Sequence, residues 1–134
     1  MVARHLKRGQ SGEQMARVFL QEQGYKIIET NWRCKSGELD IICRKKGLLV
    51  FVEVKTKHDT KFGLPGEALT SKKQRRLAKT ALVYLSVKNM WHVPCRFDLV
   101  AICVNEQTCE MEHVPDVFEF PKSMGCRHSY WQPW

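Results

Sequence analysis

The sequence predicts an α/β domain whose elements follow one another as helix, three strands, helix and strand, with a further short strand at the end. Apolar residues recur at helical spacing in two segments, near residues 12–23 and from about residue 70 onward. Four other segments are rich in β-branched and aromatic residues and are bounded by turn formers. A chain of 134 residues has the size of one domain. We therefore expect a single domain over residues 11–120, with a basic N-terminal arm at residues 1–10 and a loosely ordered C-terminal tail at residues 121–134.

The first helix is expected over residues 12–23. Ser11 can cap its N-terminus, and Gly24 can end it in a left-handed conformation. The apolar positions that predict its buried face are Met15, Val18, Phe19 and Leu20.

Three strands are expected next, at residues 25–31, 39–44 and 48–55. The last two are separated only by Lys45, Lys46 and Gly47, which predicts a tight hairpin with Lys46 and Gly47 at its centre. If Lys45 faces Leu48 across the turn, counting outward places Asp40 opposite Glu53 on the same face of the sheet.

The second half of the chain adds a loop, a helix and two strands. The polar stretch 56–65 predicts a loop, and a second helix begins near residue 70 or 71. Its apolar face is formed by Leu77, Ala78, Ala81, Leu82 and Leu85, and its opposite face by Lys72, Arg75, Arg76 and Lys79. Residues 95–104 are apolar enough for a central strand, and residues 111–114 predict a short edge strand.

The charge balance favours a polyanionic partner. Lys and Arg number 22 against 14 Asp and Glu, a formal charge of +8, which suits DNA, RNA or an acidic membrane surface. No apolar run approaches the roughly 20 residues that a membrane span needs, and residues 1–10 lack the apolar stretch of a secretory signal. We therefore expect a cytoplasmic protein without a membrane partner. The six cysteines show no zinc-site spacing and are expected to be reduced, mostly buried residues.

The strand Phe51-Val-Glu-Val-Lys55 carries the feature that points to chemistry. It places Glu53 and Lys55 on one face, because side chains alternate with period two. Asp40 brings a second carboxylate, and a strand carbonyl such as that of Val54 adds another oxygen, which together suit Mg²⁺ or Mn²⁺. Such an ion polarises a phosphodiester and activates water, while Lys55 can stabilise developing negative charge. The pattern predicts phosphodiester hydrolysis.

A simpler interpretation of the same residues remains open. Glu53 and Lys55 can form a solvent-facing pair on a one-sided sheet, with Asp40 a cross-strand partner of a lysine. Spacing alone does not choose between the two interpretations.

A family resemblance favours the first interpretation. Gly37-Glu-Leu-Asp40, followed by Glu53-Val-Lys55, resembles the bipartite motif of the PD-(D/E)xK nuclease superfamily. More closely, the chain resembles the YraN-type family of predicted endonucleases, which is related in fold to archaeal Holliday junction resolvases. Outside the motif, the residues that carry the resemblance are Gly12, Glu13, Ala16, Gly24, Tyr25, Asn31, Trp32, Arg33, Phe62, Gly63, Pro65, Lys72, Lys73, Arg96, Phe97 and Asp98.

The resemblance implies a restriction endonuclease-like fold, with a four- or five-stranded mixed sheet flanked by helices. It also implies a Mg²⁺-dependent endonuclease with a site built from Asp40, Glu53 and Lys55. Glu13 matches a helix-one acidic residue that often completes the site in related resolvases; alternatively, it is a glutamate favoured by the helix dipole. Lys57 stands where relatives often carry arginine. A lysine keeps the positive charge but cannot make the bidentate phosphate contact of an arginine.

Nucleic acid is the expected partner. The row Lys72, Arg75, Arg76 and Lys79, with Lys57 and Lys61 and the basic arm, can neutralise phosphates, although a solvated helix face is the plainer interpretation of the row. The sequence shows no pattern for sequence-specific readout of bases. The expectation of structure-selective DNA binding rests on the resemblance to resolvases. The expectation of a homodimer rests on it as well, because the sequence itself shows no interface. The alternative function is a noncatalytic nucleic-acid-binding accessory module with the same fold.

Overall fold

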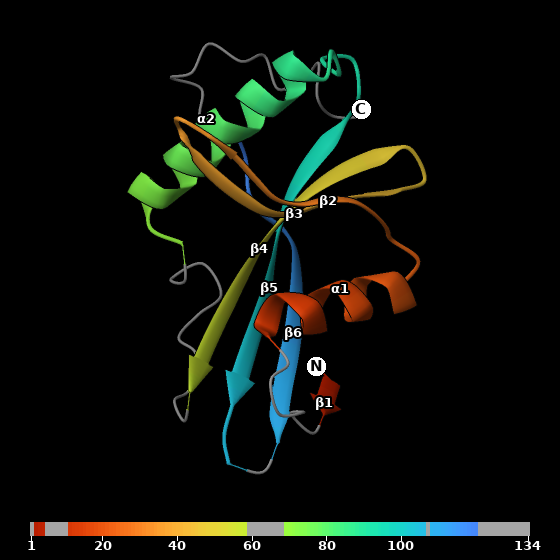
Figure 1. Ribbon diagram of the computed structural model, residues 1–134, viewed down its shortest axis with the longest axis vertical. Helices are drawn as coiled ribbons and strands as arrows, with labels where there is room; N and C mark the ends of the chain where they lie inside the picture. The colour runs from red at the N-terminus through yellow and green to blue at the C-terminus, as the bar shows by residue number, and fades with distance from the viewer. Residues whose placement is uncertain (1, 5–10, 59–68, 107, 121–134) are drawn as a thin grey trace.

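One mixed sheet of six strands lies at the centre of the molecule, with α1 and α2 packed against it (Figure 1). The computed structural model describes residues 2–4, 11–58, 69–106 and 108–120. The elements are β1 Val2–Arg4, α1 Gly12–Glu22, β2 Lys26–Cys34, β3 Gly37–Lys45, β4 Leu48–His58, α2 Ser71–Val87, β5 Cys95–Val104 and β6 Cys109–Phe118. The spatial order is β1-β6-β5-β4-β3-β2. Strands β4 and β5 run parallel, and all other neighbours run antiparallel. The predicted restriction endonuclease-like α/β fold is confirmed, but the sheet of the described residues has six strands rather than the predicted four or five, because β1 pairs with β6.

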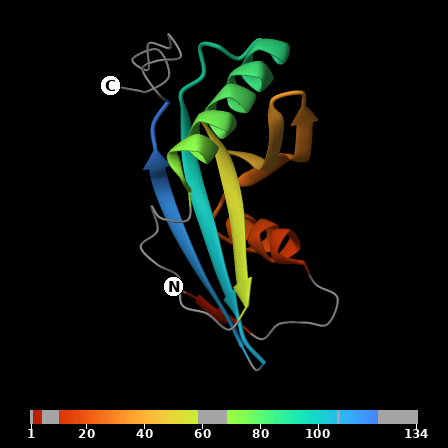
Figure 2. The same cartoon turned by 90° about the vertical axis from the view of Figure 1, so that its left-hand side faces the viewer.

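The two helices cover opposite faces of this sheet. On β4, Phe51 belongs to the cluster that packs under α2, whereas Val50 and Val52 belong to the cluster that packs under α1. This alternation is what a strand buried on both sides requires. Figure 2 shows the sheet from the side, with α2 running along it and α1 lying apart from α2. A residue on β4 can therefore face either helix, and Glu53 shares the α2 face with Phe51.

Helix α1 begins and ends where the sequence predicts. The Gln14 backbone N–H donates to Ser11 Oγ at 3.1 Å, and the Ser11 N–H donates to Gln14 Oε1 at 3.2 Å, which completes a capping box. Gly24 follows the helix with a φ of +95°. The prediction that Val18 is buried is wrong, because Val18 is 41% exposed. The buried positions are Met15, Ala16, Phe19 and Leu20, which form one stripe at 100° per residue.

The hairpin between β3 and β4 has the predicted turn and register. Lys46 and Gly47 have φ values of 51° and 81°, and positive φ at both central residues is the mark of a type I′ turn. Lys45 pairs with Leu48, and the register runs without interruption to Ile41 opposite Val52. The next position along this register brings Asp40 to Glu53.

Several strands differ from the prediction in length or position. Strand β4 continues through residues 56–58, which were expected in a loop, because they pair with residues 102–104 of β5. Strand β6 spans ten residues rather than four and is not an edge, since β1 pairs outside it and forms part of the expected N-terminal arm. Strand β2 extends to Cys34 because residues 32–34 pair with β3. The remaining loop residues, 59–68, and the tail from residue 121 lie outside the described residues.

The described cysteines are free thiols, as expected: Cys34, Cys43, Cys95, Cys103 and Cys109. Cys126 lies outside the described residues. Neither described helix has both the length and the apolar character needed to cross a membrane.

A buried polar network ties β5 to β6 on the α1 side. The Asp98 carboxylate is 1% exposed and accepts two hydrogen bonds from Arg96, each at 2.7 Å. It also contacts His113 Nε2 at 2.7 Å and accepts the Asp116 backbone N–H at 3.0 Å. Burial alone would raise the pKa of Asp98, but the hydrogen bonds from His113 and Arg96 lower it below its ordinary value. Both oxygens are thus satisfied, and the network also stabilises the irregular register where β6 reaches Asp116.

Replacing Asp98 is expected to destabilise the fold strongly. Asp98→Ala leaves the half-buried Arg96 and His113 without their carboxylate partner, which should lower the free energy of unfolding by about 3 to 5 kcal/mol. Urea denaturation followed by circular dichroism measures this, with the exposed Glu110→Ala on β6 as the matched control, for which a change within about 0.5 kcal/mol is expected. A change in Asp98→Ala no larger than in the control would contradict a stabilising role for the network.

Candidate active site

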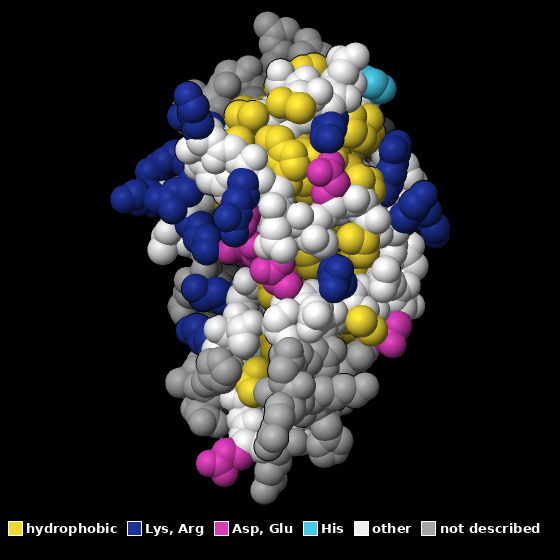
Figure 3. Space-filling view, viewed as in Figure 1, with side chains coloured by type: hydrophobic (Ala, Val, Ile, Leu, Met, Phe, Trp, Pro, Cys, Tyr) yellow, Lys and Arg dark blue, Asp and Glu magenta, His cyan; other side chains and the backbone are white. Residues whose placement is uncertain are grey.

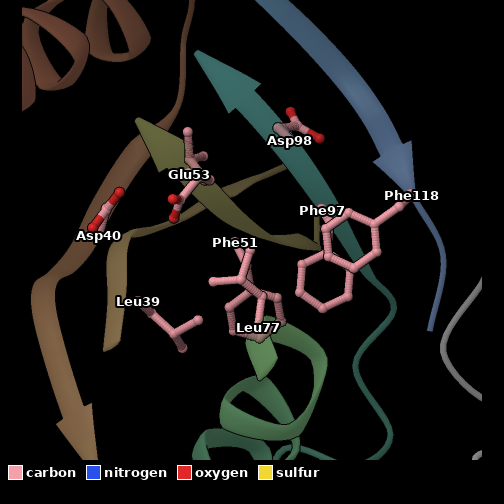
Figure 4. A pocket seen from close by; sticks show the side chains of 9 residues that line it. Leu39, Asp40, Phe51, Glu53, Leu77, Phe97, Asp98 and Phe118 are labelled. Carbon is pink, nitrogen blue, oxygen red and sulfur yellow. The ribbon is translucent and has the colours of Figure 1, made fainter. Parts of the chain in front are cut away.

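Two carboxyl groups meet where the β3–β4 pairing ends. Asp40 on β3 and Glu53 on β4 occupy the position just beyond the Ile41–Val52 pair, and their side chains are within hydrogen-bonding reach of each other. Figure 4 shows the two groups side by side, with Asp98 apart from them on β5. Glu53 is only 9% exposed, so the alternative in which it belongs to a solvent-facing pair is wrong.

Asp40 is fixed by a bond to the backbone of β4. Its Oδ2 accepts the Val54 N–H at 2.9 Å, so the side chain takes the place of the next backbone acceptor in the ladder. In an extended strand the N–H and the C=O of one residue point to the same neighbour. The Val54 carbonyl therefore points toward the side of β4 on which Asp40 lies, which is where the sequence predicts a third oxygen.

In the part of the chain that the structure describes, the cation that contacts Glu53 is Lys73 rather than Lys55. Lys73 Nζ on α2 lies 2.7 Å from Glu53 Oε2. Lys55 shares a strand face with Glu53 and is half-buried, but among the described residues it forms no ion pair with either carboxylate. Sequence reasoning missed Lys73 as a site residue. The position of Lys73 in the helix could have identified it, because Lys73 lies one turn before the buried Leu77 and so faces the sheet.

Burial and charge act together on Glu53. Removal from water, and then the neighbouring Asp40 carboxylate, raise the pKa of Glu53 to about 7 from its ordinary 4.5, against the opposing effect of Lys73. A carboxyl group with so large a shift, beside a second carboxyl group, is typical of a functional site.

Glu13 lies near this pair without joining it. Burial and then the Asp40 carboxylate raise the pKa of Glu13. Its Oε1 is buried and has no hydrogen-bond partner among the described residues. The side chain borders a polar hollow of about 260 Å³, together with Ser11, Gln14, Arg17, Thr30 and Asn31. Within the described residues, no three Asp, Glu, His or Cys side chains are arranged to hold a metal ion, so Glu13 is a neighbour of Asp40 and not a third ligand in this structure.

The remaining basic residues lie where the sequence places them. Lys72, Arg75, Arg76 and Lys79 are exposed on α2, and we call them the α2 basic row. Lysine and arginine side chains gather on the left of Figure 3, over α2 and the end of β4, beside the acidic groups at the centre of this face. Lys57 is half-buried on β4 and alternates onto the face of Glu53 and Lys55. Glu38 lies on β3 and pairs with Arg33 on β2.

The residues present fit a small divalent cation. Asp40, Glu53 and the Val54 carbonyl supply hard oxygen atoms, the donors that Mg²⁺ and Mn²⁺ prefer. The buried Glu53 and the half-buried Asp40 repel each other when both are ionised, and a cation between them would relieve that repulsion. The unpartnered Oε1 of Glu13 adds an acceptor nearby.

The pKa of Glu53 predicts a pH-dependent stability. A folded pKa of about 7 above the ordinary 4.5 means that the folded state binds the proton more tightly than the unfolded state. The stabilisation is therefore fully present below pH 4.5 and is lost as the pH rises through about 7, by about 3 kcal/mol in the free energy of unfolding. Glu53→Gln in chelator should remove this decline. Parallel stability curves for the native chain and the variant across that range would contradict the raised pKa.

Three relatives with similar sequences match between 70% and 98% of the chain. A protein of Nitratidesulfovibrio vulgaris (strain DP4) is 42% identical over 132 residues, which is 98% of this chain and 98% of the relative. One from Syntrophus aciditrophicus is 43% identical over 118 residues, 88% of this chain and 93% of the relative. One from Symbiobacterium thermophilum is 51% identical over 94 residues, 70% and 80% of the two chains. All three are named as UPF0102 proteins.

The family model that matches this chain spans residues 12–102, a range that includes α1, the β3–β4 hairpin and α2. Asp40, Glu53, Lys55 and Lys73 all lie inside it. The chain therefore belongs to the uncharacterised protein family UPF0102.

Proposed function

We propose that this protein is a divalent-metal-dependent nuclease that hydrolyses phosphodiester bonds, with structure-selective DNA as its substrate. The observation that carries the proposal is the contact between Asp40 and Glu53 at the end of the β3–β4 pairing. Burying two carboxyl groups together costs free energy of folding. Such an arrangement is therefore expected where the two groups serve a function. Binding a cation for phosphate chemistry is such a function, and the adjoining α2 basic row supplies the charge that attracts a polyanion.

Each residue of the site has a role in this mechanism. Asp40, Glu53 and the Val54 carbonyl would hold Mg²⁺ or Mn²⁺, which when bound polarises the phosphodiester and lowers the pKa of the attacking water. The Val54 N–H fixes the orientation of Asp40. Lys55 would stabilise negative charge that develops on the phosphate oxygens. Glu13, with its raised pKa and unpartnered oxygen, would hold a water or proton beside Asp40.

The α2 basic row and Lys57 would bind the phosphate backbone on either side of the cleaved bond. Such contacts position the strand but do not read its sequence. The choice of DNA, and of junctions, flaps or ends over plain duplex, is supported by the resemblance to resolvases.

A noncatalytic nucleic-acid-binding module is the second candidate. The Lys73–Glu53 ion pair favours it, because it neutralises one carboxylate without a metal ion. The contact between Glu53 and Asp40 favours the enzyme, because a second carboxylate beside phosphate would weaken binding.

Cleavage assays distinguish the two candidates. A labelled panel of single-stranded, duplex, flap and four-way-junction DNA is incubated with the native chain and Mg²⁺ or Mn²⁺. Asp40→Ala and Glu53→Ala should each lower the cleavage rate by about 100-fold or more, and chelator should abolish cleavage. Glu110→Ala, an exposed acidic residue of β6, is the matched control and should cleave at the native rate. Binding without cleavage of any substrate would favour the accessory module.

Salt dependence tests the α2 basic row. Replacing Arg75 and Lys79 together by glutamine should lower the slope of log affinity against log salt by about 1.8 in magnitude, because each lost phosphate contact contributes about 0.9. Lys26→Gln, an exposed lysine on the edge strand β2, is the control for removed positive charge. Fluorescence anisotropy with a duplex in chelator gives both slopes, and equal slopes in all proteins would show that the row is a solvated helix face.

A further inference from the structure

The Lys73–Glu53 ion pair joins the candidate metal site to the basic surface of α2. Lys73 Nζ lies 2.7 Å from Glu53 Oε2, and the Lys73 side chain is 39% exposed whereas that of Glu53 is 9% exposed. The carboxylate is thus confined, while the lysine reaches it from the surface. Of the two partners, Lys73 is the one that can move without opening the core.

The backbone of Lys73 is held in place even if its side chain moves. Its backbone N–H donates to Thr70 Oγ1 at 3.1 Å, as part of the N-terminal cap of α2. The flexible four-carbon stem of a lysine can turn its ammonium over several ångströms from a fixed Cα. Arg76 lies three positions further along the helix and is a neighbour of Lys73 on the helix surface, while Lys72 is the preceding residue. An ammonium that leaves Glu53 therefore has the α2 basic row within reach.

A divalent cation bound to Glu53 would meet the Lys73 ammonium at close range. Two positive ions on one carboxylate repel each other strongly, and the repulsion is larger at a site poor in water. The more highly charged ion also binds Asp40, so it holds the carboxyl pair more firmly than the single ammonium does.

We propose that Lys73 is a resident counter-ion of Glu53 that a divalent cation displaces, and that the released ammonium then binds a phosphate of the nucleic acid beside Lys72 and Arg76. The inference rests on the proposed function, because it takes Asp40 and Glu53 as the cation ligands. Cation binding and phosphate binding then favour each other. The cation binds more tightly when Lys73 has left Glu53, and the phosphate binds more tightly when the Lys73 ammonium is free to contact it. Lys73 is thereby a positioning residue for Glu53 before the cation binds and a phosphate contact afterwards.

Cation affinity without nucleic acid tests the displacement. In isothermal titration calorimetry with Mg²⁺ at about pH 8.5, Lys73→Gln should bind the ion about 5- to 20-fold more tightly than the native chain, because no ammonium competes. Lys73→Arg keeps a competing cation and should stay within about threefold of the native affinity. Lys72→Gln removes the same charge from the adjacent, exposed position and should change the affinity by less than about twofold. Equal effects in Lys73→Gln and Lys72→Gln would overturn the displacement.

Salt dependence of DNA binding tests the second role. With Ca²⁺ present, Lys73→Gln should lower the slope of log affinity against log salt by about 0.9, and in chelator by less than half of that. Lys72→Gln should lower the slope by about 0.9 in both conditions, since its contact does not depend on the cation. The length of the labelled duplex is checked after each titration. A Lys73→Gln slope change that is the same with Ca²⁺ and in chelator would overturn the release of Lys73.

The calorimetry also separates failure of this inference from failure of the proposed function. If the native chain binds no Mg²⁺, or if Asp40→Asn binds it as the native chain does, the metal site and the proposed function fall together. If Asp40→Asn abolishes binding but Lys73→Gln binds with native affinity, only the role of Lys73 is overturned. Thermal melting of each variant establishes that the half-exposed position 73 tolerates the changes.

Discussion

The register of the β3–β4 hairpin is the constraint on which the candidate site depends. A two-residue turn at Lys46 and Gly47 sets which residues face each other, and a slip of one residue would move Asp40 to the other face of the sheet. Backbone pairing stops after Ile41 and Val52, so the carboxylate of Asp40 is available to take the Val54 N–H. The same bond turns Asp40 toward Glu53. The two-residue turn therefore determines that the Asp40 and Glu53 carboxyl groups lie in contact.

Much of this arrangement could be predicted from sequence, because the signals are local. The I′ turn, the capped start of α1 and the two-faced pattern of α2 each depend on residues close together in the chain. The misses depend on contacts between distant segments. The extent of β6 follows from Asp98, whose side chain satisfies the Asp116 N–H where the strand is irregular. The extension of β4 past Lys55 follows from its parallel pairing with β5, which no local pattern reports.

In the candidate site, too, some residues could be predicted from local sequence signals and others depend on how distant segments pack. Strand alternation and hairpin register suffice to bring Asp40 and Glu53 together, but not to find Lys73, since that requires knowing how α2 lies across the sheet. Glu13 shows a second limit. Its position on α1 near Asp40 agrees with the family pattern, yet the distance that makes a carboxylate a ligand or only a neighbour depends on the packing of α1, which sequence spacing does not fix.

The formal charges at the site explain why a metal-free form would be a poor phosphate binder. With both carboxyl groups ionised, Asp40, Glu53 and Lys73 carry one net negative charge, next to a helix face that is basic. Under the proposed function, a phosphate approaching the α2 basic row would therefore meet repulsion at the carboxyl pair. A divalent ion between the carboxylates cancels their charge, and the Lys73 ammonium, no longer needed there, adds to the attraction. Under the proposed function, the placement of one lysine between the two surfaces would thus make the charge that a nucleic acid meets depend on whether the metal site is filled.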